Sequence, residues 1–415
     1  MEIFEDTCRF EIEIVLNIKR STSSKKLKNE DYKKIAIITC CMDDWGGSEE
    51  LWAKSIPMLK KGTEITLYKN NINRSHPEFI KLANEHVKFI TLEPELSFGQ
   101  RLSRKIRQTI KRIRTKDYSE NYGIAKFYEE MKATNPDLVI VAQGINFDGL
   151  IYAWQCKLLN IPYVIIAQKA VDFYWPYPTD RDYMKETLKH AKMCFFVSQH
   201  NLQLTEEQFG LRLQNSMVVY NPIKTKVNVL PFPDTEHGYK LACVARLFVI
   251  DKGQDILLRI MNKEKWRARP ITVSFIGTGL DEQGIKDMAA LLKLDNVEFI
   301  GFHEDIENVW KNYHALLLPS RSEGLPLSMI EAMSVGRTVI VSNAGGNADL
   351  ITDGLNGFIS EATEKDFESA MERAWEMRKQ WQNIGTTASL YITNHFPLSP
   401  ETDFANHLNN LLDEL

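Results

Sequence analysis

The stretch HALLLPSRSEGLPLSMIEAMSVGRTVIVSNAGG, residues 314–346, decides the fold class of this protein. An apolar run ends at Pro319, the loop SRSEGL follows, and a helical pattern opens at Pro326, where a missing N–H costs nothing. Gly336 ends that helix, and a β-branched run follows it. This order is typical of a parallel sheet covered by helices. We therefore expect the loop to lie at the carboxyl end of the sheet, where such folds bind their ligands.

The same alternation of short apolar runs and helical patterns extends over most of the chain. The runs are too uniformly apolar to have a solvent face, which indicates parallel sheets with helices on both sides. A proline-containing stretch without helical period interrupts the rhythm at residues 220–238 and is the best linker candidate. Strands are predicted within residues 33–40, 63–68, 87–92, 137–144, 162–168, 193–198, 217–221, 239–245, 271–279, 297–301, 314–320 and 337–343.

Two doubly wound, Rossmann-like α/β domains are therefore expected. We assign residues 31–222 to the first domain, 223–237 to the linker and 238–392 to the second domain, with a final helix from about residue 400. A strictly alternating pattern within residues 1–30 predicts an extra amino-terminal strand, followed by a polar linker.

Composition places the chain among ordinary globular proteins. It has 415 residues, of which 44% are hydrophobic and 26% charged, and this composition excludes a disordered chain. Its net charge of -4 does not favour nucleic-acid binding. Its six cysteines form no Cys-x-x-Cys pair, so reduced, packed thiols are expected. The acidic first 20 residues do not resemble a secretory signal, and no apolar run approaches the roughly 18 residues of a membrane span. We expect a cytoplasmic protein.

Two glutamates in the opening stretch are candidates for ligand binding. Glu323 lies on the loop, and Glu331 lies about 8 Å along the axis from the helix start, at roughly 1.5 Å per residue. This spacing fits an elongated ligand touched at two points better than a metal ion or a glycosidase carboxylate pair. The alternative is a pair of solvated carboxylates, one at the helix start and one on the surface.

Two cations follow another predicted strand, in the segment ACVARLFVIDKGQDILL. Arg246 and Lys252 occupy the loop between strand and helix, and together they suit a phosphate group, Arg as a bidentate fork and Lys as a point charge. The alternative is that both are simply solvated.

Glycine pairs mark two further loops. Gly46 and Gly47 let the backbone approach a ligand directly before a helix opened by Ser48, although a tight turn explains them equally well. Gly277 belongs to FIGTGLDEQG, which has Glu282 where a dinucleotide fingerprint needs its third glycine. An NAD-dependent oxidoreductase is therefore the least favoured reading.

Together these segments resemble the retaining nucleotide-sugar glycosyltransferases of family 4, which have the two-domain GT-B fold. The resemblance implies that the two domains face a cleft, and that residues 393–415 form a crossover segment and a terminal helix that returns to the first domain. The resemblance covers the chain from about residue 33 to the end and is most specific in the second half. There the family's motifs follow one another in order: Arg246-Leu247, Lys252-Gly253, FIGTG, NVEFIGFHED, SRSEGLPLSMIEAM and NAGGNADLI.

The resemblance implies which residues bind the nucleoside-diphosphate sugar. Arg246 and Lys252 would bind the diphosphate, Glu331 the ribose and Glu323 the transferred sugar. The loop at Phe302 and His303 would bind the base. The full donor-binding set implied by the resemblance is Gly46, Gly47, Arg246, Lys252, Gly277, His303, Glu323, Gly324, Leu325 and Glu331. Because part of this set belongs to the opposite domain, catalysis would require the cleft to close.

The implied catalytic residues are Glu323, Arg246, Lys252 and Gln168. Many family members have a histidine at the last of these positions, after the strand that here reads PYVIIAQKA. Gln168 can hydrogen-bond a sugar hydroxyl but cannot carry a proton. Fixed cations and helix amides can stabilise a departing diphosphate, so no metal ion and no cofactor is expected.

The sequence therefore predicts a retaining hexosyltransferase for polysaccharide biosynthesis, with a nucleotide sugar as donor and a glycan or lipid-linked acceptor. Two alternatives stay open: a nucleotide-sugar epimerase on the same fold, and a catalytically idle sugar-nucleotide-binding protein.

Residues 101–116, RLSRKIRQTIKRIRTK, contain eight Lys or Arg and no acidic residue. Apolar residues recur at helical spacing, so a helix would have one apolar stripe among its cations. Such a helix can dock on an anionic membrane surface, which suits a peripheral membrane protein. Packing on the first domain and binding of a charged acceptor are the alternatives.

Overall fold

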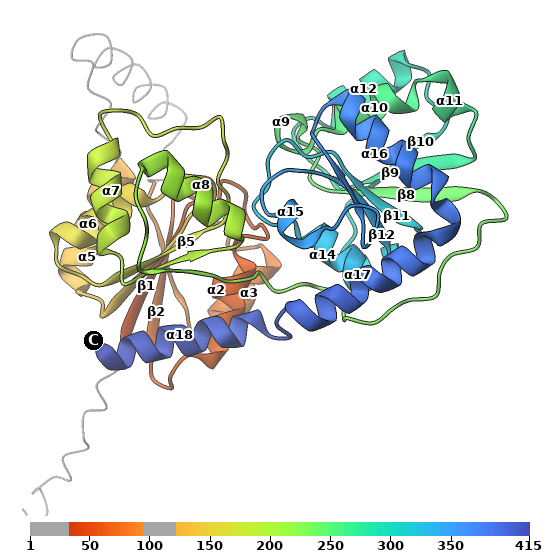
Figure 1. Cartoon of the computed structure of the whole chain (residues 1–415). Helices are drawn as coiled ribbons and strands as arrows, with labels where there is room; N and C mark the ends of the chain where they lie inside the picture. Colours follow the sequence, from red (N-terminus) through yellow and green to blue (C-terminus); the bar gives the residue numbers. More distant parts are fainter. Residues whose placement is uncertain (1–32, 94–121) are drawn as a thin grey trace, which may run out of the picture.

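The computed structural model describes residues 33–93 and 122–415. These residues form two parallel α/β domains side by side (Figure 1), which confirms the predicted fold class. The strand predicted within residues 1–30 and the basic segment 101–116 lie outside the described residues.

The first domain is built on a seven-stranded parallel sheet of order β3-β2-β1-β4-β5-β6-β7. Its strands are β1 (Lys34–Thr39), β2 (Glu64–Lys69), β3 (Lys88–Thr91), β4 (Leu138–Ala142), β5 (Tyr163–Ala167), β6 (Met193–Phe196) and β7 (Ser216–Val218). Its helices are α2 (Glu50–Ser55), α3 (Pro77–Asn84), α5 (Tyr122–Thr134), α6 (Leu150–Leu158), α7 (Arg181–His190) and α8 (Gln199–Phe209).

The second domain has a six-stranded parallel sheet of order β10-β9-β8-β11-β12-β13. Its strands are β8 (Tyr239–Val244), β9 (Ile271–Ile276), β10 (Val297–Gly301), β11 (Ala315–Leu318), β12 (Thr338–Ser342) and β13 (Phe358–Ser360). Its helices are α9 (Val249–Lys252), α10 (Gln254–Met261), α11 (Glu264–Arg267), α12 (Glu282–Leu291), α13 (Ile306–Trp310), α14 (Leu327–Ser334), α15 (Asn347–Leu350), α16 (Glu364–Glu376) and α17 (Trp381–His395). The edge strand β13 was not predicted, because three residues are too short a run to show a pattern.

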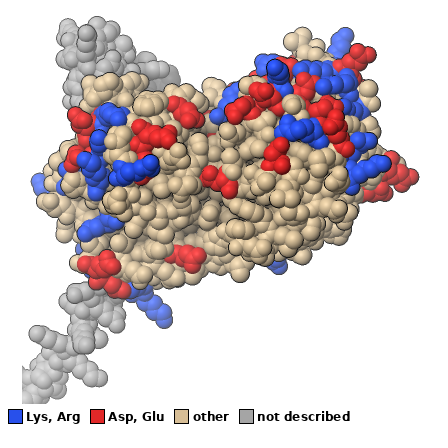
Figure 2. All heavy atoms as spheres, viewed as in Figure 1, with Lys and Arg blue, Asp and Glu red and all other residues tan. Residues whose placement is uncertain are grey.

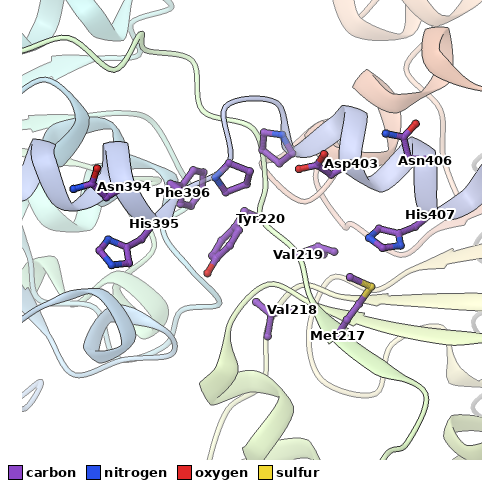
Figure 3. A pocket seen from close by; sticks show the side chains of 12 residues that line it. Met217, Val218, Val219, Tyr220, Asn394, His395, Phe396, Asp403, Asn406 and His407 are labelled. Atoms are coloured by element: carbon purple, nitrogen blue, oxygen red, sulfur yellow. The ribbon is translucent and has the colours of Figure 1, made fainter.

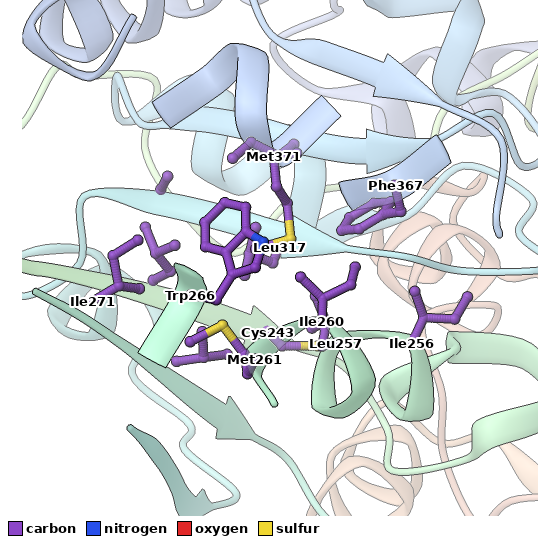
Figure 4. Close-up of a cluster of buried hydrophobic side chains, with 14 of the residues drawn as sticks. Cys243, Ile256, Leu257, Ile260, Met261, Trp266, Ile271, Leu317, Phe367 and Met371 are labelled. Carbon is purple, nitrogen blue, oxygen red and sulfur yellow. The ribbon is translucent and has the colours of Figure 1, made fainter. Parts of the chain in front are cut away.

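Both faces of the second sheet are buried, which explains its uniformly apolar strands. Cys243 and Leu317 point from β8 and β11 into the cluster that contains Leu257 of α10 and Met371 of α16 (Figure 4). The neighbouring strand residue Leu316 belongs to a separate core cluster, formed with α14 and α17. Successive side chains of a strand alternate between faces, so each sheet has two apolar faces and needs helices on both.

The carboxyl-terminal segment crosses between the domains. Helix α17 packs on α14 of the second domain, and α18 (Pro400–Glu414) packs on α2 of the first. The ring of Phe404 lies 4.9 Å from that of Phe195 in β6, so α18 completes the core of the first domain. Figure 1 shows this helix returning beneath the first sheet.

Charged side chains are concentrated on the outer helices of the second domain (Figure 2). There Lys263 pairs with Glu364 and Glu368, and Arg269 pairs with Glu372, so that α11 and the residues around it are joined to α16. Within residues 33–93 and 122–415, no helix is long and apolar enough to cross a bilayer.

Candidate active site

The residues predicted to bind a donor come mainly from loops at the carboxyl edges of the two sheets. In the second domain, Arg246 follows β8, Gly277 follows β9 and Glu323 follows β11. In the first domain, Gly46 follows β1 and Gln168 follows β5. Loops of the first domain contact loops of the second, so the two sheet edges lie close together.

Lys252 and Glu323 form a close ion pair. The Lys252 Nζ atom lies 2.6 and 2.7 Å from the two carboxylate oxygens of Glu323, and the Ser320 hydroxyl donates to Glu323 Oε1 at 2.7 Å. Glu323 is only 5% exposed, so the interpretation of this residue as a solvated carboxylate is wrong. In this arrangement Glu323 balances the charge of Lys252.

Arg246 contacts carboxylates from both domains. Its guanidinium donates to Asp43 of the first domain at 2.5 Å and lies 3.4 Å from Asp251 of its own domain. Asp251 also pairs with Lys169 of the first domain, at 2.9 Å. No pattern in the sequence singles out Asp43, Asp251 or Lys169, because their contacts depend on which loops face each other across the domains.

Glu331 is buried in the middle of α14. It is 4% exposed, and its Oε1 atom accepts a hydrogen bond from the backbone N–H of Lys224 in the interdomain linker at 3.1 Å. Burial raises the pKa of Glu331, and the Lys224 N–H and charge oppose that shift only in part. The interpretation of Glu331 as a surface carboxylate is therefore wrong.

The amide of Gln168 is bonded within the protein. Its Nε2 donates to the Ser48 carbonyl at 3.1 Å and to Asn221 Oδ1 at 3.3 Å, and its Oε1 accepts from Asn221 Nδ2 at 2.7 Å. Gln168 is 6% exposed and Asn221 7%. Both Nε2 hydrogens of Gln168 are therefore engaged, and a sugar hydroxyl would have to donate to the second lone pair of Oε1 or replace one of these bonds.

Two glycines allow the domains to approach closely. A β-carbon at Gly324 would lie 1.8 Å from the carbonyl oxygen of Gln168. A β-carbon at Gly47 would lie 3.1 Å from the Leu327 side chain, at the start of α14. The loop after β1 therefore faces the helix that follows the Glu323 loop.

Gly277 has a packing role in the second domain. Its φ is +143°, and a β-carbon there would lie 2.1 Å from the Ala245 carbonyl oxygen. The Leu247 N–H donates to the Thr278 carbonyl at 2.9 Å in the same contact. This packing joins the loop after β9 to the loop that contains Arg246.

A buried ion pair supports the Gly46-Gly47 loop. Glu49 is fully buried, accepts from the Ser48 hydroxyl at 2.6 Å and lies 4.0 Å from Lys69 Nζ. Lys69 also donates to the Cys41 carbonyl at 2.6 Å. Helix α2 begins at Glu50 rather than Ser48, because the Ser48 hydroxyl bonds to a carboxylate and not to a helix N–H.

The remaining predicted residues differ in exposure. Leu325 is buried, whereas Phe302 and His303, the predicted base site, are exposed on the loop after β10. Across the two described stretches of the chain, no cluster of three or more His, Cys, Asp or Glu side chains is suited to hold a metal ion.

A separate pocket of about 560 Å³ lies at the chain crossings between the domains (Figure 3). It is lined by β7 and the ends of α17 and α18, including Tyr220, His395 and His407. None of the predicted donor-binding residues lines it, so this pocket is distinct from the predicted donor site.

Comparison with known proteins relates this geometry to an enzyme family. Residues 228–390 match the family model described as glycosyl transferases group 1. The chain is 27% identical over 289 residues to lipopolysaccharide 1,6-galactosyltransferase of Salmonella typhimurium, covering 66% of this chain and 76% of that protein. It is 31% identical over 146 residues to glycogen synthase of Pseudomonas syringae, covering 35% of this chain and 30% of that enzyme.

The fold has a close counterpart among solved structures. Anabaena Alr3699/HepE in complex with UDP-glucose matches with a TM-score of 0.68 and 17% identity, covering 92% of this chain and 100% of the other. This likeness shows a shared GT-B fold. The second domain of this chain therefore matches the glycosyl transferases group 1 model, and the whole chain has the two-domain GT-B architecture that the sequence resemblance predicted.

Proposed function

We propose that this protein transfers a hexose from a nucleoside-diphosphate sugar to a glycan or lipid-linked acceptor, with retention of the anomeric configuration and without a metal ion. The observation that carries the proposal is the pairing of Arg246 and Lys252 with the carboxylates of Asp43, Asp251 and Glu323, where the loops of the two domains meet. A diphosphate can replace such carboxylates as the anionic partner, because Arg and Lys bind phosphate and carboxylate oxygens in the same way.

The proposed chemistry needs stabilisation of negative charge on the leaving group. The bond between the anomeric carbon and the diphosphate oxygen breaks, and a bond to the acceptor hydroxyl oxygen forms on the same face. The hydroxyl proton passes to an oxygen of the departing phosphate. Preorganised cations at this position lower the barrier, because they bind the developing phosphate charge without reorganising. Arg246 and Lys252 are assigned this role.

The donor's sugar and ribose are assigned to the two glutamates. Glu323 and the amides of Gly324 and Leu325 would contact the transferred sugar, and Glu331 would accept hydrogen bonds from the ribose. The burial of both carboxylates supports this assignment, since a buried acceptor discriminates strongly for hydroxyl donors. The UDP-glucose bound to Anabaena Alr3699/HepE makes a uridine nucleotide the first donor to test.

The acceptor is proposed from the relatives. The lipopolysaccharide galactosyltransferase supports a growing surface glycan as acceptor, and hence a cytoplasmic protein that is peripheral to the membrane. Residues 101–116 supply the cations that such membrane docking needs.

A direct assay tests the proposal. The protein is incubated with UDP-glucose, UDP-galactose or UDP-N-acetylglucosamine, with and without a glycan acceptor and with a chelator, and NMR identifies the products. We expect acceptor-dependent release of UDP, a product with the donor's anomeric configuration, and no effect of the chelator. Epimerised nucleotide sugar formed without acceptor would instead identify an epimerase, and binding without turnover would identify an idle protein.

A further inference from the structure

An exposed aromatic loop follows β5 of the first domain. Within residues 172–177, the exposed fraction is 70% for Phe173, 42% for Tyr174, 56% for Trp175 and 67% for Tyr177. Large aromatic side chains are mostly buried in folded proteins, and a cluster of exposed ones marks an interaction surface. We call residues 172–177 the aromatic loop.

Buried amides hold the backbone of this loop. Asn146 accepts from the Val171 N–H at 2.9 Å and donates to the Tyr174 carbonyl at 3.3 Å. Gln208 donates to the carbonyls of Val171 and Tyr174, at 2.9 and 3.1 Å. Asn146 is 7% exposed and Gln208 is fully buried, so the start of the loop is anchored from within the domain.

Ring packing anchors the loop further. Tyr174 stacks on Phe147 with the ring centroids 5.7 Å apart, and Phe147 packs edge-on against the buried Phe209 at 5.4 Å. Pro176 is buried between its exposed neighbours Trp175 and Tyr177. A surface that is already ordered loses less conformational entropy when it binds, so this loop is suited to recognition.

The loop begins beside the candidate active site. The carbonyl oxygen of Gln168 lies against Gly324 of the second domain, and Lys169 forms an ion pair with Asp251 of that domain at 2.9 Å. Phe173 follows Lys169 by only four positions, and four extended residues span at most about 14 Å. A short run of sugar rings that ends at the active site can therefore reach the loop, which arches between β5 and α7 in Figure 1.

The charges around the loop favour a neutral, hydroxyl-rich partner. Asp172 and Asp182 are exposed, and Arg181 is the only cation in residues 171–182. The guanidinium of Arg181 bonds to the Gln208 carbonyl, so it is turned towards the protein. Exposed carboxylates repel anionic lipid head groups but accept hydrogen bonds from sugar hydroxyls.

We propose that Phe173, Trp175 and Tyr177 form a stacking platform for the glycan acceptor, at a distance of a few sugar units from the transfer site. The C–H face of a pyranose ring packs on an aromatic ring, while its hydroxyls remain available to carboxylates such as Asp172. This inference rests on the proposed function, because it assigns the acceptor side of the same reaction.

Calorimetric titration of the full chain without donor tests the platform. The probes are two neutral oligosaccharides, maltoheptaose and isomaltoheptaose. We expect the wild type to bind at least one of them, and Trp175→Ala combined with Tyr177→Ala to weaken that binding at least roughly tenfold. Trp175→Phe keeps a ring and should stay within about threefold of the wild type. Leu291→Ala is the control, since Leu291 is 80% exposed at the end of α12 in the other domain.

Failure of the platform and failure of the proposed function give different results. The platform is overturned if neither oligosaccharide binds, or if the double variant binds as the wild type does. It is also overturned if the double variant loses binding to phosphatidylcholine vesicles while oligosaccharide binding is unchanged, because the loop would then contact lipid. Ring-dependent oligosaccharide binding without any sugar transfer would leave the platform in place and refute the transferase.

Discussion

Gly324 of the second domain lies directly against the carbonyl oxygen of Gln168 in the first, where a β-carbon at position 324 would be 1.8 Å from that oxygen. No side chain tolerates such a distance to backbone. The loop with Glu323 and the end of β5 can therefore meet in this arrangement only because residue 324 is glycine. This contact links a motif residue of one domain to the residue that stands where the sequence resemblance places a histidine in the other.

Gly324→Ala should separate these two loops and lower kcat/KM by at least about 100-fold, because misplacement of about 1 Å at a catalytic site has this effect. Steady-state kinetics measure the loss. The matched control is Gly284→Ala in α12, where a β-carbon meets nothing within 4 Å and should leave activity unchanged. If Gly324→Ala stays within about threefold of the wild type, the closed contact is not needed for catalysis.

Arg246→Ala and Lys252→Ala should each lower turnover by roughly 10²- to 10³-fold, since each removes a fixed charge from the leaving diphosphate. Arg259→Ala is the control, because the two arginine side chains are similarly exposed, Arg259 at 48% and Arg246 at 42%. Asp43→Asn should instead lower KM for the donor several-fold, because Asp43 competes for Arg246. Kinetics with the donor varied distinguish these effects, and an unchanged turnover of Arg246→Ala would refute the phosphate assignment.

Glu331→Gln should stabilise the fold at neutral pH while weakening donor binding. Burial raises the pKa of Glu331, so the folded protein binds this proton more tightly than the unfolded chain, and stability falls as pH rises towards the folded pKa. The glutamine can still accept from the Lys224 N–H. In thermal unfolding from pH 4 to 8, the Tm of the variant should exceed that of the wild type by a margin that grows with pH to about 2–4 °C. An equal difference at every pH would show that this carboxyl does not carry the effect.

Gln168→Ala should affect stability as well as activity. The change leaves the buried amide of Asn221 without its partner, which costs about 1–3 kcal/mol of the free energy of unfolding. From the sequence alone, one would expect the fold to be unaffected. Because Gln168 and Asn221 share this bond, the double alanine variant should lose less stability than the sum of the single variants. Additive losses in urea unfolding would contradict a coupled pair.

Residues 101–116 should bind anionic membranes. Co-sedimentation is expected with vesicles that contain phosphatidylglycerol but not with phosphatidylcholine alone, and added salt or reversal of four of the eight charges should weaken it. Protein that stays in the supernatant with both lipids at low salt would exclude membrane docking by this segment.

The strand and loop order was predictable because it depends on local patterns. Uniform apolar runs identified the buried strands, and Pro326 and Gly336 marked the two ends of helix α14. The edge strand β13 was missed, since a three-residue strand depends on its pairing with β12 for its identity. The start of helix α2 was also predicted wrongly. The helix begins at Glu50 and not at Ser48, because the Ser48 hydroxyl bonds to the buried carboxylate of Glu49.

The sequence by itself determined the two parallel sheets, the loops that carry Arg246 and Glu323, and the likeness of the second domain to the glycosyl transferases group 1 model. Only the tertiary structure decided which groups partner these residues. Asp43 meets Arg246 although 203 positions separate them, and Asn221 meets Gln168 across 53. The apolar pattern of a strand depends only on residues that are neighbours in the sequence, so it can be recognised from that stretch alone. An ion pair or hydrogen bond forms wherever the packed domains place two polar groups within about 3 Å, and no local pattern encodes that distance.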